Sequence, residues 1–426
     1  MLEALADWNP WWTGGRVPPE LLGRARELTA RADELLSFRE VKSITGLRRS
    51  GKSTLLYQFI DHLLGKGGIS PQRILLVNFE DPVLSSRTLG EVFNEYQARI
   101  NPETKPYIFL DEVHRCKDWV PFLRKAYDLR HLEQAFITDS SSKFVRAEYA
   151  GILTGREVNV YVPPLSFGEY LQWKGLDGAG PRTGQQSNRV RHALEQYLRW
   201  GGLPEVVLMD SDTKRKILLE NYLADIVHRD VVERHGVDYH KVRELVDFLA
   251  SNPGALFSPR KYNRTSGLSL ETLDRYLHYL SEVFLVELVP RFAHSLRAQQ
   301  VAPKKVYLTD TGFFGGLGFR MTENLGHLYE NAVFSQIRRS GREVYYWKGR
   351  GECDFVVKEG RRVAQAVQVC YRRDIGSEAR EMRGLKEAME ELRIPEGMVV
   401  SAEGDHFEVS DGKAVRFVAL RDYLTG

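Results

Sequence analysis

Residues 46–54 read Gly-Leu-Arg-Arg-Ser-Gly-Lys-Ser-Thr and have the G-x-x-x-x-G-K-S spacing of a phosphate-binding loop. The residues before them, Val41-Lys-Ser-Ile-Thr45, include β-branched side chains and predict a buried strand. From Ser53 to Leu64 apolar residues recur at the spacing of one helical face, and Gly65 is expected to end this helix. Because a strand and a helix flank the glycines, a chance match in a glycine-rich turn is disfavoured.

Such a loop presents backbone N–H groups at a helix N-terminus, where the donors and the helix dipole both attract polyphosphate. Lys52 adds a charge for the β- and γ-phosphates, and the Ser53 hydroxyl is placed to coordinate Mg²⁺. At the two glycines a side chain would block the phosphates or forbid the turn. The predicted ligands are therefore ATP and Mg²⁺. The residues expected to bind them are Gly46, Arg49, Ser50, Gly51, Lys52, Ser53 and Thr54.

Strand and helix patterns alternate from Arg39 to Val162. Further strands are predicted at 73–79, 106–112, 135–138 and 158–162, with helices at 89–100 and 119–129. This alternation predicts an α/β fold, a parallel sheet covered by helices on both faces. The ligand is then expected beyond the carboxyl ends of the strands.

The third strand ends in Asp111-Glu112, the form of a Walker B element. We expect Asp111 to hold Mg²⁺ through water and Glu112 to orient or activate the attacking water. Acidic pairs at strand ends also serve as caps or solvated groups, but a phosphate loop earlier in the chain favours the catalytic interpretation.

Two further residues are candidates for catalysis. Ser140 belongs to Thr138-Asp-Ser-Ser141 at the end of the fourth strand, where a hydroxyl could sense the γ-phosphate or simply form a turn. Arg156 precedes the fifth strand. It could reach the γ-phosphate of a neighbouring subunit as a trans-acting arginine, or form a local salt bridge.

Taken together, residues 41–170 resemble the AAA-family ATPases of prokaryotes that carry a C-terminal domain of unassigned function. The motifs that carry the resemblance are Gly-Leu-Arg-Arg-Ser-Gly-Lys-Ser (46–53), Leu-Asp-Glu-Val-His (110–114), Ile-Thr-Asp-Ser-Ser-Ser (137–142), Gly-Arg-Glu (155–157), Pro-Leu-Ser-Phe-Gly-Glu-Tyr (164–170) and Gly-Gly-Leu-Pro-Glu (201–205). The resemblance implies a five-stranded core, an oligomer and the roles given above. Asp139 departs from the family, which usually has glycine there.

The patterns predict five regions along the chain. They are a lead-in segment (1–37), the AAA-type core (38–173), a loop and helical lid (174–238), a winged-helix domain (239–322) and a second small α/β domain (323–426). In the lead-in, a helix is expected at about 20–36, and Trp8, Trp11 and Trp12 either pack against their own domain or stack on bases. The loop is expected at 175–188, and the lid to about His235.

Residues 240–292 have a winged-helix pattern. The expected inward positions of its first and third helices are Val242, Leu245, Val246, Phe248, Leu249, Leu273, Tyr276, Leu277 and Leu280. The second helix is expected to begin at Ser258, and 284–292 to form the wing. The third helix could lie in a DNA major groove, or the module could contact only protein. The side chains expected to face phosphates are Arg260, Lys261, Arg264, Arg275 and His278.

The last region resembles the restriction-endonuclease-like nuclease fold, in which an Asp and an acid-x-Lys pair bind Mg²⁺ and activate water. Glu330 and Asp354 match that pattern, but Gln368 replaces the second acid and Cys370 the lysine. A neutral amide binds Mg²⁺ poorly, and a thiol supplies no cation. We therefore expect a catalytically degenerate domain that serves as a DNA-binding or assembly surface.

Composition narrows the function classes further. The chain has 60 Lys+Arg against 57 Asp+Glu, a net charge of +3, so any nucleic-acid surface must be local. No stretch approaches the roughly 18 apolar residues of a membrane span, and the three cysteines form no C-x-x-C pair. The expectation is a soluble cytoplasmic ATPase that couples hydrolysis to DNA remodelling, translocation or switching. The alternatives are a nucleotide-dependent switch acting on a protein partner and an ATP-gated nuclease.

Overall fold

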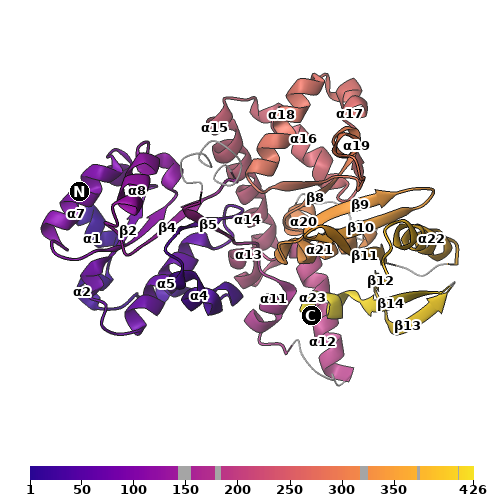
Figure 1. The fold of residues 1–426 in the computed structure, drawn as a ribbon, viewed down its shortest axis with the longest axis horizontal. Helices are drawn as coiled ribbons and strands as arrows, with labels where there is room; N and C mark the ends of the chain where they lie inside the picture. Colours follow the sequence, from indigo (N-terminus) through magenta and orange to yellow (C-terminus); the bar gives the residue numbers. More distant parts are fainter. Residues whose placement is uncertain (143–154, 178–183, 317–324, 372–374, 411) are drawn as a thin grey trace. The chain divides into compact units, whose positions relative to one another are not determined.

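The computed structural model describes residues 1–142, 155–177, 184–316, 325–371, 375–410 and 412–426 (Figure 1). The chain divides into two compact units. One comprises Met1–Pro163 with Glu282–Phe284, and the other comprises Pro164–Ser281 with Leu285–Gly426. Residues 164–173, which the sequence analysis placed in the core, are thereby grouped with the second unit.

A five-stranded parallel sheet forms the centre of the first unit (Figure 1). Its strands are β1 (Val41–Thr45), β2 (Ile74–Asn78), β3 (Tyr107–Asp111), β4 (Gln134–Asp139) and β5 (Glu157–Tyr161), in the order β2-β3-β4-β1-β5. The accompanying helices include α5 (Lys52–Gly65), α6 (Pro82–Ser85), α7 (Leu89–Arg99) and α8 (Trp119–Asp128). The predicted parallel α/β sheet is confirmed, although Gly65 lies inside α5 and Lys66 follows it as the cap.

The strand order decides which residues meet at the carboxyl edge of this sheet. β4 lies between β1 and β3, with Ile44 paired to Thr138 and Leu110 paired to Ile137. The loop after β1 and the acidic pair after β3 are therefore separated by the end of β4. This arrangement makes the side chains that end β4 the direct neighbours of both motifs.

The lead-in segment does not form the single helix expected at about 20–36. It contains α1 (Leu2–Trp8), α2 (Trp11–Gly14), α3 (Pro19–Leu22), a 3-10 turn (Glu27–Arg31) and α4 (Ala32–Ser37). Gly23 follows α3 with φ +55° and ψ −143°, a conformation that interrupts the helix and that residues with a side chain rarely adopt. The prediction of one continuous helix was wrong for this reason.

The tryptophan cluster packs against its own unit, as one of the two interpretations expected. Trp11 and Trp12 donate their Nε1–H groups to the carbonyl of Ile74 at 3.1 and 2.8 Å. Asn9 binds both the N–H and the C=O of Leu76 through its side chain. These contacts cover the outer edge of β2, which would otherwise expose unpaired backbone groups. Both rings are buried, so they offer no surface on which bases could stack.

The second unit begins with helices. They are α11 (Phe167–Trp173), α12 (Gly184–Trp200), α13 (Pro204–Leu208), α14 (Asp212–Asp225), a π-helical segment (Ile226–Val232) and α15 (Glu233–His235). Helices are present where the lid was expected, but the loop expected to reach Asn188 ends earlier, because α12 already begins at Gly184. Residues 178–183 of that predicted loop lie outside the described part of the chain.

The next segment combines four helices with a small sheet. Its elements are α16 (Tyr239–Ser251), β6 (Leu256–Phe257), α17 (Pro259–Ser266), α18 (Leu270–Glu282), β7 (Val286–Val289), α19 (Leu296–Val301) and β8 (Lys304–Leu308). The antiparallel strand order is β6-β8-β7. The three predicted helices are confirmed, with Ser258 as the cap of the second. Two details were wrong: Phe248 is 43% exposed, and 284–292 forms one strand whose partner is β8.

The C-terminal segment is a second α/β arrangement, as expected. It contains α21 (Leu325–Arg339), β9 (Glu343–Lys348), β10 (Glu352–Glu359), β11 (Arg362–Cys370), α22 (Ile375–Glu391), β12 (Glu396–Ser401), β13 (Asp405–Ser410), β14 (Lys413–Ala419) and α23 (Leu420–Thr425). The six strands are ordered β13-β14-β12-β11-β10-β9. Figure 1 shows α22 beside β9, β10 and β11. Among the helices that the structure describes, none combines the length and the apolar character needed to cross a bilayer.

Candidate nucleotide site

The glycine-rich loop has the backbone conformations that only glycine readily adopts. Gly46 has φ +152°, and a Cβ at this position would lie 2.3 Å from the carbonyl oxygen of Val162. Gly51 has φ +97° and stands at the N-cap of α5. Arg49 also has a positive φ, of 69°, which an arginine adopts only at some cost. The loop is therefore a tight backbone turn that a side chain at Gly46 would disrupt.

Lys52, the first residue of α5, folds back over this loop. Its ammonium group donates to the carbonyl oxygens of Gly46 at 3.1 Å and Leu47 at 3.2 Å. The side chain is buried, whereas the next residue, Ser53, is exposed. The lysine charge and the serine hydroxyl thus stand at the start of one helix, where the loop turns.

Asp111, at the end of β3, lies within reach of both motifs. Thr138 donates its hydroxyl to Oδ1 of Asp111 at 2.5 Å, and the Ser53 hydroxyl lies close enough to lower the pKa of this carboxyl. Burial raises the pKa of Asp111, while the hydrogen bond from Thr138, the nearby Ser53 hydroxyl and the charge of Lys52 oppose that rise. Residues 46–53 and Asp111 therefore converge on one place, as the ligand set of a magnesium-bound phosphate requires.

Glu112 follows in a tight left-handed turn. Its φ is +50° and its backbone N–H donates to the hydroxyl of Thr138 at 2.9 Å. Burial is the main cause that raises the pKa of the Glu112 carboxyl, and Lys52 is the main opposing charge. The acidic pair is therefore held by one threonine, which donates to Asp111 and accepts from Glu112.

Within the stretch Thr138–Ser141, Thr138 is the residue whose hydroxyl contacts both acidic residues, and the proposed sensing role of Ser140 stays a prediction. Ser140 is buried directly after β4, two residues beyond Thr138. Asp139, between them, accepts the N–H of Ser141 through Oδ1 at 2.9 Å. The strand order explains why Thr138 is the residue of this stretch that contacts the acidic pair, because its pairing with Ile44 places it beside the loop strand.

Arg156 lies at the amino ends of the strands of the same sheet, opposite to the end that carries the phosphate loop. It precedes β5, its carbonyl accepts from the N–H of Val41, and its Nε donates to Oδ1 of Asp128 at 2.9 Å. The phosphate loop follows Thr45, which pairs with Tyr161 at the far end of β5. At about 3.3 Å per residue, the length of the strand separates Arg156 from the loop by roughly 16 Å. It cannot contact a nucleotide held by its own chain.

Arg26 braces the loop from outside, a contact that the sequence analysis missed. Its guanidinium donates to the carbonyl oxygens of Ser50 at 2.9 Å and of Pro163 at 3.0 Å. Arg26 belongs to the lead-in segment, before the first strand, so no local pattern connects it with residues 46–54. The lead-in is consequently part of the structure that shapes the nucleotide site.

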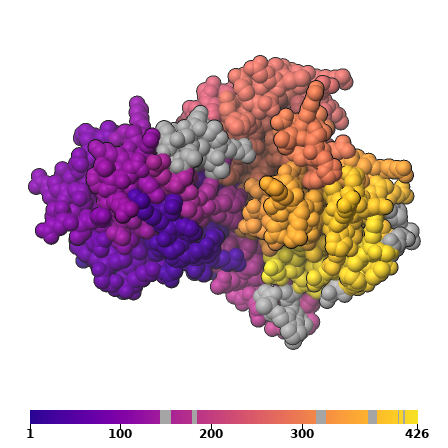
Figure 2. All heavy atoms as spheres, viewed as in Figure 1, coloured from indigo at the N-terminus to yellow at the C-terminus, as the bar shows by residue number. Residues whose placement is uncertain are grey.

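In the second unit, the five basic candidates are exposed. Arg260, Lys261 and Arg264 lie on α17, and Arg275 and His278 lie on α18. Residues 259–282 form part of the surface drawn in Figure 2. The surrounding sequence is mixed, because Glu271 and Asp274 are exposed on α18 as well. The positive surface is therefore concentrated on α17.

The three nuclease-like candidates meet in a buried ionic cluster. Gln368 donates to Oδ2 of Asp354 at 2.7 Å. The cluster also contains a lysine that the sequence analysis missed: Lys305, on β8, lies 2.9 Å from one oxygen each of Glu330, Glu352 and Asp354. The sequence pattern sought a lysine two residues after Gln368 and found Cys370. The cation comes instead from a strand of the preceding segment.

Burial has the largest single effect on the pKa values of Glu330 and Lys305 in this cluster. Burial, followed by the charge of Asp354, raises the pKa of Glu330 to about 7. Burial alone would lower the pKa of Lys305, but the carboxylates around it, Asp354 first, raise it well above its usual value. Lys305 is therefore a permanent internal cation.

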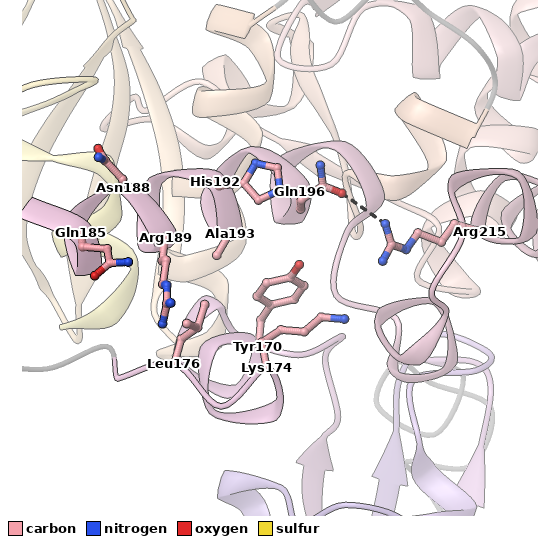
Figure 3. A pocket seen from close by; sticks show the side chains of 10 residues that line it. All are labelled: Tyr170, Lys174, Leu176, Gln185, Asn188, Arg189, His192, Ala193, Gln196 and Arg215. Carbon is pink, nitrogen blue, oxygen red and sulfur yellow. Dashed lines mark hydrogen bonds between the residues drawn. The ribbon is translucent and has the colours of Figure 1, made fainter.

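A separate pocket of about 660 Å³ lies in the second unit (Figure 3). Lys174, Arg189 and Arg215 line it beside the ring of Tyr170, and no carboxylate is among its lining residues in the described part of the chain. Arg215 is already engaged by Gln196 at 3.2 Å and Asp212 at 2.9 Å. The pocket suits an anionic group but contains no residue of the nucleotide loop.

The parallel sheet, the loop after β1 and the acidic pair after β3 define an AAA-type P-loop ATPase domain. The AAA domain family matches residues 38–171. Two families of domains of unknown function, DUF8612 and DUF4143, match residues 191–323 and 325–420.

The chain belongs to the same family as an uncharacterized protein of Haemophilus influenzae, with 30% identity over 355 residues that cover 79% of this chain and 85% of that protein. An uncharacterized protein of Methanocaldococcus jannaschii is 27% identical over 386 residues, covering 88% and 84% of the two chains. Among solved structures, a Walker-type ATPase of Pyrococcus abyssi is similar with a TM-score of 0.43 and 16% identity, over 69% of this chain and 95% of that one. Such a score does not bear on function.

Proposed function

We propose that this protein binds ATP with Mg²⁺ and hydrolyses it. The observation that carries the proposal is the convergence of Ser53 and Thr138 on Asp111, with Lys52 close enough to influence both acidic residues. In this assignment the loop N–H groups and Lys52 hold the phosphates, and Ser53 and Asp111 hold the metal. Glu112 accepts the proton of the attacking water. Mg²⁺ would neutralise charge on the phosphate oxygens.

Nucleotide binding by the Lys52→Ala variant tests the loop assignment. Lys52 stands at the start of α5 inside the loop, so its removal should weaken ATP binding roughly 100-fold, the effect of losing a buried charge-assisted contact. Lys125→Ala, an exposed lysine on α8, is the matched control. Calorimetry that measures equal ATP affinity for Lys52→Ala and the unaltered protein would refute the assignment.

For the second unit we propose DNA contact through α17 and α18, coupled to hydrolysis in a self-associated form. The order of this segment is helix, strand, helix, helix, strand, helix, strand, which is that of a winged helix with one added helix, α19, between its last two strands. The exposed side chains Arg260, Lys261 and Arg264 on one helix support a phosphate-binding role.

ATPase assays with duplex, single-stranded, forked and junction DNA test this role. We expect stimulation that weakens with salt, because phosphate contacts release counterions. The triple variant Arg260→Ala, Lys261→Ala, Arg264→Ala should lose it. A triple variant on the first unit, Arg124→Ala, Lys125→Ala, Arg130→Ala, removes the same charge and should keep it. No stimulation by any of the four DNAs would count against DNA as the partner.

The alternative, a protein partner, is favoured by one observation in the same segment. Phe248 and Leu256 are 43% and 42% exposed beside a pocket of about 320 Å³ that Phe257 and Tyr262 also line. Lys261 lies at this pocket, which suits an apolar side chain flanked by an acidic residue. Phe248→Ala would impair a protein contact there while leaving DNA stimulation intact.

We infer that the C-terminal segment does not cleave nucleic acid. Lys305 contacts one oxygen of each carboxylate, and Gln368 and the N–H of Val369 occupy Oδ2 of Asp354. Protein donors, including the positive charge of Lys305, therefore compete with Mg²⁺ for these carboxylates. Nicking of plasmid DNA in Mg²⁺ or Mn²⁺ that disappears in Asp354→Ala would overturn this inference.

A further inference from the structure

Three side chains form a compact group next to the acidic pair. Glu112 and His114 lie in the turn after β3, and Asp139 ends β4. Nδ1 of His114 lies 3.4 Å from Oε2 of Glu112 and 3.4 Å from Oδ1 of Asp139. One potential ligand atom from each of the three residues lies within 4.8 Å of the other two. The group uses neither Ser53 nor Asp111, the residues assigned to Mg²⁺.

The contacts within the protein leave two of these atoms unsatisfied. Oε2 of Glu112 and Nδ1 of His114 are buried, and within the described residues neither has a hydrogen-bond partner. The side chain of Glu112 is only 9% exposed. A buried carboxylate oxygen without a partner is costly, so native proteins usually supply it with a donor or a cation. Oδ1 of Asp139 does accept the N–H of Ser141, but a carboxylate oxygen has a second lone pair for another ligand.

The spacing matches the edges of a metal coordination shell. A tetrahedral site with bonds of 2.0–2.1 Å has ligand-to-ligand distances of about 3.3–3.4 Å. Both distances from His114 agree with this value. One imidazole nitrogen and two carboxylate oxygens suit Zn²⁺ and its neighbours Co²⁺ and Mn²⁺, whereas Mg²⁺ prefers a shell of oxygen alone.

We propose that Glu112, His114 and Asp139 form a binding site for a transition-metal ion of the Zn²⁺ class. A metal held there engages Oε2 of Glu112, so this carboxylate can no longer accept a proton from water. The ion therefore inhibits ATP hydrolysis instead of supporting it. The inhibitory effect rests on the proposed ATPase function, but metal binding does not.

Cobalt titration of the full-length protein tests the site without any need for activity. Co²⁺ in a shell of nitrogen and oxygen ligands absorbs visible light, and this absorption is lost when Zn²⁺ displaces the Co²⁺. We expect one equivalent to bind, with at least tenfold weaker binding in His114→Ala and in Asp139→Asn. His131→Ala, an exposed histidine in the same unit, is the control and should bind normally. Circular dichroism verifies that each variant is folded. Equal binding by folded His114→Ala and the unaltered protein, or no binding at one equivalent, overturns the site.

The consequence for hydrolysis is measured separately, with Zn²⁺ added to the Mg²⁺·ATP reaction. We expect inhibition that a chelator reverses and that shifts at least tenfold toward higher Zn²⁺ in His114→Ala. If Co²⁺ binds but Zn²⁺ leaves the rate unchanged, the inhibitory role is wrong and the site stands. If the protein hydrolyses no ATP at all, the proposed function fails, while the cobalt titration still decides the metal site.

Discussion

Thr138 and Asp111 are joined by a hydrogen bond of 2.5 Å from the threonine hydroxyl to the carboxylate, across adjacent strands. The same hydroxyl accepts the N–H of Glu112 at 2.9 Å. One side chain therefore sets the positions of both acidic residues, and it does so from β4, the strand between the loop strand and the acidic strand.

The substitution Thr138→Val keeps the shape of this side chain and removes both hydrogen bonds. A hydrogen bond to a buried charged group contributes about 1.5–3 kcal/mol, so we expect kcat for ATP to fall about tenfold to a hundredfold. Thr138→Ser retains the hydroxyl and should keep most of the activity. Steady-state kinetics that show no difference between the valine and serine variants would contradict a positioning role for Thr138.

The variant Glu112→Gln should bind ATP normally and turn it over about 10²–10⁴-fold more slowly, the usual effect of removing a general base. The amide has nearly the same size as the carboxylate but cannot accept the proton of the attacking water. Nucleotide affinity and single-turnover hydrolysis, measured on the same sample, separate the two effects. Loss of ATP binding together with activity would instead indicate that Glu112 has a structural role.

Arg156 lies too far from its own nucleotide loop, so any catalytic role must be exercised on a neighbouring subunit. Arg156→Ala should then lower kcat by at least roughly 100-fold, and mixing it with Lys52→Ala subunits should restore part of the activity. Asp128→Asn breaks the local ion pair but keeps the arginine, and serves as control. If Asp128→Asn has the same effect as Arg156→Ala, and mixing restores nothing, the arginine acts only in its local salt bridge.

Removal of the internal cation by Lys305→Met leaves three carboxylates facing one another. Breaking a buried ion pair from one side typically costs about 3–5 kcal/mol, so we expect a loss of this size in the free energy of unfolding. Mg²⁺ should restore part of it, because the freed carboxylates can then bind a divalent cation. Lys358→Met, whose partner Glu343 is largely exposed, should change stability by less than about 1 kcal/mol. Urea unfolding with and without Mg²⁺ measures both effects, and a stable Lys305→Met protein would contradict them.

Glu330 makes the stability of the second unit depend on pH. Burial raises its pKa from the usual 4.5 to about 7, so between these values the folded protein holds a proton that the unfolded chain has released. The free energy of unfolding contributed by this group is therefore complete below pH 4.5 and is lost as the pH rises through 7. At about 1.4 kcal/mol per pKa unit, the loss is at most about 3.5 kcal/mol.

The variant Glu330→Gln should show a flatter pH dependence over this range. A smaller slope of the same sign remains, because burial also raises the pKa of Asp310 to about 6. Urea midpoints between pH 5 and 8 give the comparison. An identical pH dependence in Glu330→Gln would show that the carboxyl of Glu330 is not the titrating group.

The strands of the first unit and the two phosphate-site motifs could be predicted from the sequence, because each is a local pattern. Val41–Thr45, the glycines and the face of α5 are contiguous, and Asp111-Glu112 directly follows its strand. The break in the lead-in helix could not be predicted, since the backbone of Gly23 interrupts a segment whose composition favours a helix. The exposure of Phe248 could not be predicted either, because this residue occupies a position in the inward-facing pattern of α16.

By itself, then, the sequence determined that a phosphate loop and an acidic strand end exist in this protein. Only the tertiary structure decided which residues support them. Thr138 reaches Asp111 because β4 inserts between β1 and β3, and Arg26 braces the loop from a segment that precedes the sheet. Lys305 meets Asp354 from a different sheet, 49 residues earlier in the chain. Backbone patterns are set by neighbours in the chain, whereas hydrogen bonds and ion pairs depend on which strands lie side by side.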